Sequence, residues 1–217
     1  MQRALIDNQP HCTLDDIVPE YDSRNPFARQ LFHARLRVAA HHIAALSPSS
    51  LLDVGCGAGK LFGTLQSAGT IVPEQVGIDV MAGVRDLQEF FPQAFFFVKS
   101  ILHTDFKDNT FDVITCLDTL EHIEQLNVAL GEIGRIMKPG GHLITSEPTE
   151  SVLYKLLRLL FKGTYSQESG PCAGKHYYNA REIDAGVRMS GFVRLAITRL
   201  PLFTPFDLFH INLYRKK

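Results

Sequence analysis

Hydrophobic residues occur in two patterns along this chain, and segments that show one pattern alternate with segments that show the other. Short apolar runs are typical of buried strands, whereas apolar residues three or four positions apart are typical of one helix face. Strands are predicted over residues 51–54, 75–80, 95–98, 111–117 and 142–146. Helices are predicted over residues 26–46, 60–68, 81–91, 119–137 and 180–189. This alternation predicts a parallel sheet with helices on both faces.

The pattern changes near the end of the chain. Two strand-like runs, at residues 192–200 and 208–214, have no helix between them and therefore predict an antiparallel hairpin at one edge of the sheet. Residues 95–98 are apolar without interruption, which predicts a strand buried on both faces.

Length and composition fit one α/β domain, since the chain has 217 residues of which 45% are hydrophobic. We expect four parts within it. They are an N-terminal helical cap (1–47), a ligand-binding core (48–149), a lid or substrate insertion (150–180), and the last helix with the hairpin (181–217). No internal repeat or low-complexity segment divides the chain further.

Composition also bears on where the protein works. The sequence has no run of eighteen apolar residues and does not start with the apolar segment of a signal peptide. Its four cysteines, Cys12, Cys56, Cys116 and Cys172, are scattered and form no C-x-x-C pair, which argues against a zinc site or a disulfide framework. We therefore expect a cytoplasmic protein.

The net charge of −1 conceals an asymmetry along the chain. Residues 1–150 carry 11 Lys+Arg and 19 Asp+Glu, whereas residues 151–217 carry 11 and 4. If residues 151–162 are helical, Lys155, Arg158 and Lys162 form a basic stripe opposite an apolar one. Such a helix suits peripheral contact with an anionic membrane or a lid over a greasy substrate, and a helix packed on the sheet is the alternative.

One glycine-rich loop is the main indication of a ligand-binding site in this sequence. Asp53-x-Gly55-x-Gly57-x-Gly59 follows the first predicted strand, and Asp79 ends the second. The acid at the second strand tip can accept hydrogen bonds from both hydroxyls of a ribose. Asp53, just ahead of the loop, would repel a pyrophosphate but suits a cationic ligand.

This arrangement resembles the class I methyltransferases that use S-adenosylmethionine (SAM), in particular methyltransferase type 11 members and, more weakly, ubiquinone-pathway O-methyltransferases. The resemblance covers about residues 48–149. It implies a Rossmann-like, seven-stranded sheet of order 3-2-1-4-5-7-6, with strand 7 antiparallel, and SAM as cofactor. It also implies the residues that bind SAM, which are Asp53, Gly55, Cys56, Gly57, Gly59, Asp79, Val80, Ser100, Ile101, Leu117 and Asp118.

Within that set, Asp53 would anchor the amino group, Asp79 the ribose, and Leu117 and Asp118 the methionine part. Ser100 stands where the family has an aspartate that accepts from the adenine amine. A hydroxyl also accepts, but without charge, so weaker cofactor binding is expected.

Asp118, Glu121 and His122 form the most distinctive feature on the acceptor side. Spaced i, i+3 and i+4, they would share one face of the predicted helix. Some relatives, among them ubiquinone-pathway O-methyltransferases, carry E-x-x-E-H here and bind a divalent metal with it. The L-E-H triplet also occurs in members that use no metal, so we expect no metal. His122 and His176 are the candidate catalytic residues, and His176 is the preferred general base.

These features together predict a SAM-dependent methyltransferase for a small-molecule or lipid-like acceptor, with oxygen as the expected methylated atom. A nucleotide-dependent oxidoreductase is disfavoured by Asp53 and by the glycine spacing. A non-catalytic SAM-binding subunit and an RNA methyltransferase remain as alternatives. No appended nucleic-acid module is evident, so nucleic acid is not the expected partner. The sequence gives no indication of the oligomeric state.

Overall fold

The computed structural model describes residues 21, 25–149, 175–201 and 207–217 of the chain. Its strands are β1 (Ser50–Val54), β2 (Glu74–Asp79), β3 (Ala94–Val98), β4 (Phe111–Leu117), β5 (Met137–Pro148), β6 (Phe192–Leu200) and β7 (Phe209–Lys216). They form one seven-stranded sheet in the order β3-β2-β1-β4-β5-β7-β6. Strands β1 to β5 pair in parallel, and β7 is antiparallel to both β5 and β6. The predicted sheet order and the antiparallel hairpin are confirmed.

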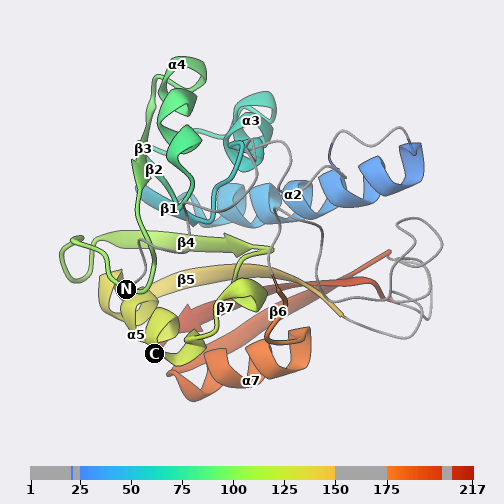
Figure 1. Ribbon diagram of the computed structural model, residues 1–217, viewed down its shortest axis with the longest axis vertical. Coiled ribbons are helices and arrows are strands. Elements are labelled where there is room, and N and C mark those ends of the chain that lie inside the picture. The colour runs from blue at the N-terminus through green and yellow to red at the C-terminus, as the bar shows by residue number, and fades with distance from the viewer. Residues whose placement is uncertain (1–20, 22–24, 150–174, 202–206) are drawn as a thin grey trace.

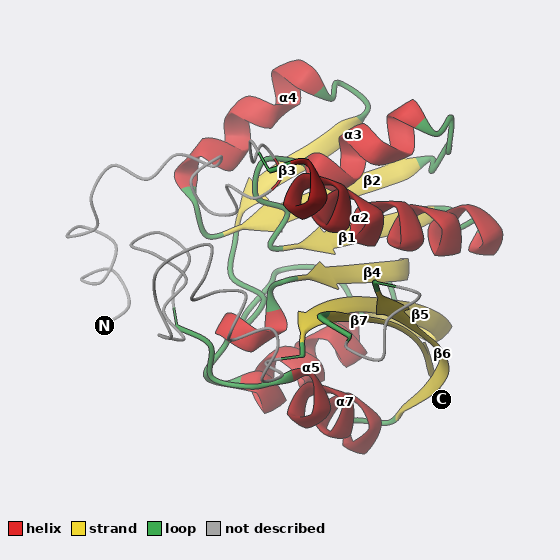
Figure 2. Ribbon diagram, turned by 90° about the vertical axis from the view of Figure 1, so that its right-hand side faces the viewer, coloured by secondary structure: helices red, strands yellow, loops and turns green. Residues whose placement is uncertain are grey.

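Helices cover both faces of this sheet. The α-helices are α2 (Pro26–Leu46), α3 (Lys60–Ser67), α4 (Leu87–Phe90), α5 (Leu126–Ile136) and α7 (Ala180–Met189), and the 3₁₀ turns are η3 (Ala82–Asp86) and η4 (Leu120–His122). Helices α2, α3 and α4 lie on one side of the sheet, and α5 and α7 lie on the other (Figures 1 and 2).

Side-chain alternation along the strands builds a core on each face. In β1, Leu51 packs in the cluster that includes residues of α2 and α3, whereas Leu52 packs in the cluster that includes residues of α5 and α7. Period-two alternation in a strand buried on both faces requires apolar residues in succession, as this strand has. The core therefore fixes the register of β1, at whose end the glycine-rich loop begins.

Two helix starts follow from capping residues. Asn25 Oδ1 accepts from the backbone N–H groups of Phe27 at 3.0 Å and Ala28 at 3.4 Å, with Pro26 at the first helical position of α2. Asn179 and Glu182 form a reciprocal capping box at the start of α7. The box fixes the point at which the chain passes from the site into α7.

The predicted helix over 119–137 is wrong in its first part. The chain makes the short turn η4, leaves helical geometry at Ile123, and begins α5 at Leu126. The carbonyl of Glu121 accepts from the N–H of Tyr177 at 2.7 Å, and the hydroxyl of Tyr178 donates to the carbonyl of Glu124 at 2.9 Å. These distant partners take up carbonyls that a continuous helix would use itself, so hydrophobic spacing alone overestimates the helix.

Other boundaries differ as well. The predicted helix over 81–91 is divided into η3 and α4, and β5 is longer than predicted. Strand β3 is not buried on both faces, because Phe95 is 57% exposed and Phe97 is 39% exposed. This strand is the edge of the sheet, where no helix of the described part of the chain covers the face that carries Phe95 and Phe97.

Among the described residues, no helix is long and apolar enough to cross a membrane. The predicted basic helix over 151–162 lies outside the described residues, as does most of the insertion predicted over 150–180. The fourfold division of the chain stays a prediction.

Candidate functional site

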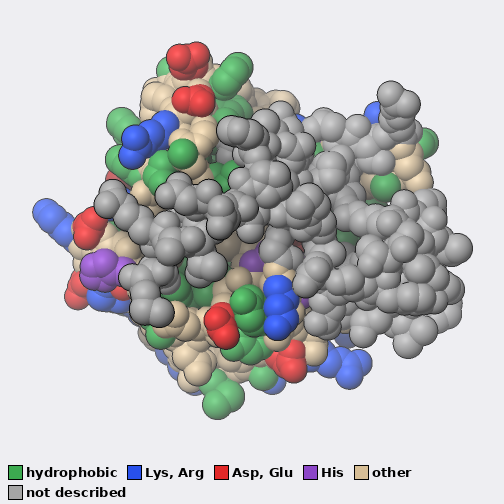
Figure 3. Space-filling model, in the orientation of Figure 1, with side chains coloured by type: hydrophobic (Ala, Val, Ile, Leu, Met, Phe, Trp, Pro, Cys, Tyr) green, Lys and Arg blue, Asp and Glu red, His purple; other side chains and the backbone are tan. Residues whose placement is uncertain are grey.

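A cavity of about 450 Å³ opens at the carboxyl ends of the parallel strands, the edge at which open α/β sheets bind ligands. The space-filling view shows a hollow near the centre of the molecule with histidine side chains inside it (Figure 3). The predicted residues that line the cavity are Asp53, Gly55, Cys56, Gly57, Asp79, Val80, Ser100, Ile101, Leu117, Asp118 and His122. Gly59 instead lines a neighbouring cavity, and His176 is absent from both linings.

The glycine-rich loop adopts conformations that its glycines permit. Gly55 has φ of 71° and Gly57 has φ of 47°, both in the left-handed region. A Cβ on Gly55 would lie 2.3 Å from Oγ1 of Thr119, a hydroxyl that donates to the Val54 carbonyl at 3.0 Å. No atom of the described residues lies within 4 Å of a Cβ built on Gly57. The loop is therefore pinned against the segment after β4 at Gly55 and open at Gly57.

Asp53 is a buried carboxylate at the floor of this cavity. It is 3% exposed and accepts a hydrogen bond from Thr115 Oγ1 at 2.6 Å. Burial raises the pKa of Asp53 to about 7, with a smaller contribution from the charge of Asp79, against the lowering effect of Thr115. A buried carboxylate of this kind favours a cationic ligand, since a nearby positive charge stabilises its ionised form.

Asp79 ties the end of β2 to the glycine-rich loop. Its Oδ2 accepts from the N–H of Gly57 and its Oδ1 from the N–H of Met81, each at 3.0 Å. A carboxylate has about four acceptor positions. Asp79 can therefore brace the loop and still accept from the hydroxyls of a ribose in the cavity.

Ser100 and Ile101 follow β3 on the same side of the cavity. Ser100 Oγ accepts from the N–H of Leu102 at 3.2 Å, which holds the hydroxyl in a local turn. Ile101 is buried in the core beside the cavity. Their place in the lining is compatible with the adenine end of the predicted cofactor.

Arg35 is a residue of the site that sequence reasoning missed. It lies on α2, is 1% exposed, and forms an ion pair through Nη1 with Oδ1 of Asp118. Its guanidinium lies 4.0 Å from the ring centre of Phe32 and 4.2 Å from that of Phe209. The signal in the sequence was an arginine within an apolar stripe of a helix.

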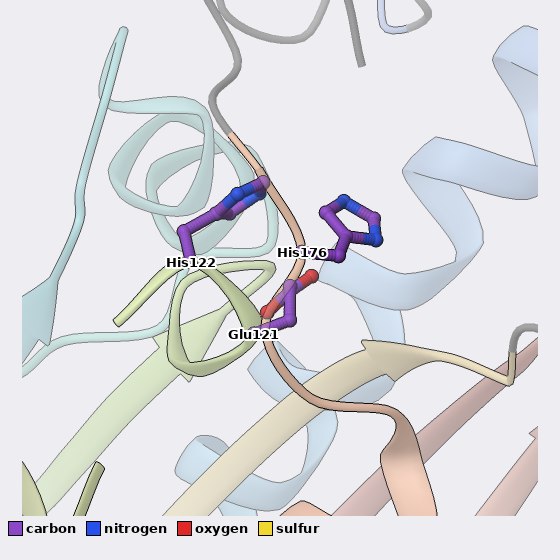
Figure 4. A group of neighbouring side chains, drawn as sticks. All are labelled: Glu121, His122 and His176. Carbon is purple, nitrogen blue, oxygen red and sulfur yellow. The ribbon is translucent and has the colours of Figure 1, made fainter. Parts of the chain in front are cut away.

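Glu121, His122 and His176 meet beyond the end of β4 (Figure 4). The two imidazole rings have centroids 4.7 Å apart and are nearly perpendicular. His122 Nδ1 lies 3.2 Å from the carbonyl of Lys175. Because a carbonyl only accepts, this contact places the proton on Nδ1 and leaves Nε2 as an acceptor. Burial, and secondarily His176, lower the pKa of His122 to about 4.

The same three residues could hold a divalent metal ion. Each offers one ligand atom, and these atoms lie within 4.8 Å of one another. Glu121 is 1% exposed, and its Oε2 has no hydrogen-bond partner among the described residues. Two nitrogens and one carboxylate oxygen suit a first-row divalent ion. Asp118, the first acid of the predicted motif, is not in this group and pairs with Arg35 instead.

A further buried acid, Glu147, lies at the end of β5. Its side chain accepts from Asn212 Nδ2 at 3.3 Å, and its Oε1 has no partner in the described part of the chain. Burial raises the pKa of Glu147 to about 8. Burial also holds the pKa of Glu121 well above its usual range, with Asp118 as the next cause. Both buried carboxyl groups therefore hold a proton more readily than an exposed glutamate does.

The chain is similar in sequence to known methyltransferases. A family model described as a methyltransferase domain matches residues 22–196. The demethylmenaquinone methyltransferase of Streptomyces griseus is 29% identical over 153 residues, which are 68% of this chain and 65% of that protein. The ubiquinone biosynthesis O-methyltransferase of Alkalilimnicola ehrlichii is 32% identical over 60% of this chain and 58% of its own.

An uncharacterised protein of Methanocaldococcus jannaschii is 36% identical over 48% of this chain and 43% of its own length. The chain thus spans about two thirds or less of each of these relatives. Among solved structures, a protein from Pyrococcus horikoshii OT3 superposes with a TM-score of 0.68 and 19% identity, covering 94% of this chain and 98% of that one.

The N-methyltransferase NodS from Bradyrhizobium japonicum WM9, solved with S-adenosyl-L-homocysteine, has a TM-score of 0.65 and 18% identity over 99% of this chain and 95% of its own. At such identities the structural likeness shows the fold. The family model, which spans most of the chain, goes further and bears on the chemistry.

Proposed function

Because the chain belongs to the methyltransferase domain family, we propose that it is a SAM-dependent methyltransferase for a small, quinone-like or lipid-like acceptor. The observation that carries this proposal is the cavity at the carboxyl ends of the strands. It combines a glycine loop that is open at Gly57, an acid at Asp79 that can accept from a ribose, and a buried acid at Asp53 suited to a cation. Quinone-pathway substrates are suggested by the names of two relatives.

SAM carries an activated methyl group on its sulfonium, so the protein's main task is to align a nucleophile for in-line displacement. Asp79 would orient the ribose while its own hydrogen bonds to Gly57 and Met81 hold the carboxylate in place. Asp53 and Asp118, which line the same cavity, would face the ammonium group. Ser100 and Ile101 would flank the adenine.

The acceptor would lie on the side of η4, where His122 lines the cavity. With its proton on Nδ1, His122 presents Nε2 as a proton acceptor toward a hydroxyl nucleophile. His176, the base preferred from the sequence, contacts His122 edge to face and lies outside the cavity lining, so it would support His122 rather than meet the acceptor itself. Oxygen is the atom that such a pair of imidazoles suits, and this part of the proposal rests on Nε2 of His122.

We propose that catalysis needs no divalent metal ion. An ion, if bound, would be held by Glu121, His122 and His176, and would polarise the acceptor oxygen. Contact of residues 151–162 with anionic membrane is a separate prediction. Co-sedimentation with anionic and neutral vesicles tests it, and equal, negligible sedimentation with both would refute it.

The deciding experiment incubates the protein with methyl-labelled SAM and fractionated cell extract, with demethylated quinone precursors as defined acceptors. Label is expected in the lipid or small-molecule fraction. Label in RNA or protein would contradict the proposed small-molecule or lipid-like acceptor and would identify a macromolecular substrate instead. SAM binding with no transfer to any fraction, unless a partner protein is added, would instead support a non-catalytic subunit.

A further inference from the structure

Arg35 and Asp118 form a buried ion pair at the wall of the cavity. Asp118 lines the cavity with a side chain that is 14% exposed, whereas Arg35 lies behind it at 1% exposure. A charge at such depth is retained only when it is paired, and the loss of one member leaves the other uncompensated. The ion pair with Arg35 therefore affects the charge and the orientation that Asp118 presents to a ligand in the cavity.

Asp118 has a backbone conformation that is uncommon for a residue other than glycine, although aspartate adopts it more readily than most. Its φ of 54° lies in the left-handed region, directly after the last residue of β4. Its N–H donates to the Ser146 carbonyl at 2.8 Å, which secures the backbone. Non-glycine residues keep such conformations where the surroundings hold them, and these positions gather at ligand sites.

Arg35 is itself held from several sides. Its guanidinium carbon lies 4.0 Å from the ring centre of Phe32 and 4.2 Å from that of Phe209, two rings that contact each other edge to face, and Nη2 donates to the Tyr21 hydroxyl at 3.4 Å. A planar guanidinium packs on aromatic rings while its N–H groups still donate at its edge, which a compact ammonium group does less well. The guanidinium that pairs with Asp118 is thus held in place without a bound ligand.

The pairing also bears on charge. Asp118 lies near the buried acids Glu121 and Glu147, and its charge contributes to the raised pKa of each. Like charges in a buried site drive carboxylates toward the neutral form, and a close cation opposes this. Arg35 would therefore keep Asp118 ionised within an acidic surrounding.

We propose that Arg35 is a positioning residue that holds Asp118 ionised and oriented toward the amino-acid end of the cofactor. This inference rests on the proposed function. A carboxylate has about four acceptor positions, so the bond from Arg35 does not by itself prevent Asp118 from receiving an ammonium group. Arg35 acts through Asp118 and makes no step of the reaction itself.

The test compares two ligands that differ at one end. S-adenosylhomocysteine carries the amino-acid part, and 5′-methylthioadenosine lacks it. Calorimetry on Arg35→Met should show at least a tenfold loss of affinity for the first ligand and less than a twofold change for the second. Asp118→Asn should give the same split. Arg37→Met, an exposed position on the same helix, is the matched control and should change neither.

The double variant distinguishes indirect from direct action. If Arg35 acts through Asp118, adding Arg35→Met to Asp118→Asn should cost no more than Asp118→Asn alone. Additive losses would overturn the proposal, as would equal losses for both ligands. Should Arg35→Met not fold, wild-type affinity of Asp118→Asn for S-adenosylhomocysteine would overturn it as well. Failure of both ligands to bind the wild-type protein would refute the proposed function instead.

Discussion

Replacing Asp79 by alanine should abolish measurable SAM binding while the chain still folds. The carboxylate accepts one hydrogen bond from Gly57 of the glycine loop and one from Met81 and, in the proposed complex, accepts from two ribose hydroxyls. Hydrogen bonds to a charged group contribute about 1.5–3 kcal/mol each. Loss of the two ribose bonds alone would therefore cost about 3 kcal/mol or more, which is at least about a hundredfold in affinity.

The hydrogen bonds that Asp79 accepts from Gly57 and Met81 add a second effect. Without Asp79 the N–H groups of Gly57 and Met81 lose their acceptor, so the loop becomes less ordered before the ligand binds. Both N–H groups are only partly buried, and water can replace the carboxylate there. The expected loss in free energy of unfolding is therefore small, about 1–2 kcal/mol.

Calorimetric titration with S-adenosylhomocysteine measures the first effect, and urea unfolding measures the second. Glu74→Ala is the matched control, because Glu74 is exposed at the opposite end of the same strand. Asp79→Asn should fall between wild type and Asp79→Ala, since an amide oxygen accepts without charge. Wild-type affinity in a folded Asp79→Ala protein would refute the assignment of Asp79 to the ribose.

Three further predictions concern other acids and hydroxyls of the site. Ser100→Asp should leave SAM affinity unchanged or raise it, and a clear loss of affinity in the folded variant would mean that Ser100 does not face the adenine. Chelator treatment should leave turnover intact. Loss of turnover that magnesium or zinc restores would instead make Glu121, His122 and His176 metal ligands. Glu147, with its folded pKa raised to about 8 by burial, should weaken the fold as pH rises from about 4.5 to 8, because the unfolded state releases its proton first. Urea unfolding at pH 5 and pH 9 should show that Glu147→Gln removes this loss, and an unchanged pH dependence would contradict it.

Most of the predicted residues that line the large cavity could be found from the sequence because their determinants are local. A strand, a glycine loop and an acid at the next strand tip are encoded within thirty residues, from 50 to 79. The sheet then brings the other strand ends to the same edge by its parallel pairing. Gly59 is the exception. It caps α3 at φ of 70° and faces the neighbouring cavity, because the loop has already turned away from the large cavity at that point.

The acceptor side could not be predicted in the same way because its contacts come from distant segments. Arg35 meets Asp118 across 83 residues of sequence, and the break between η4 and α5 involves a bond from Tyr177 to the Glu121 carbonyl. Helical spacing placed Asp118, Glu121 and His122 on one face. In the structure Asp118 pairs with Arg35, and the contacts of Lys175 with His122 and of Tyr177 with Glu121 bring His176 beside the other two.

Asp53 leads to a final prediction about protons. Its pKa of about 7 in the free protein results mainly from burial. An ammonium group that binds beside it would favour the ionised form and lower that pKa. Binding of S-adenosylhomocysteine near pH 7 should therefore release a fraction of a proton, and affinity should rise between about pH 6 and pH 8.

Calorimetry in buffers of different ionisation enthalpy measures this release directly. The apparent enthalpy of binding should vary with the buffer for the wild-type protein and not for Asp53→Asn, which keeps an acceptor for Thr115 but has no proton to lose. 5′-Methylthioadenosine, which lacks the ammonium group, should bind without the effect. A buffer-independent enthalpy for S-adenosylhomocysteine in the wild-type protein would show that the amino group does not approach Asp53, and would leave Asp118 as the acid that receives it.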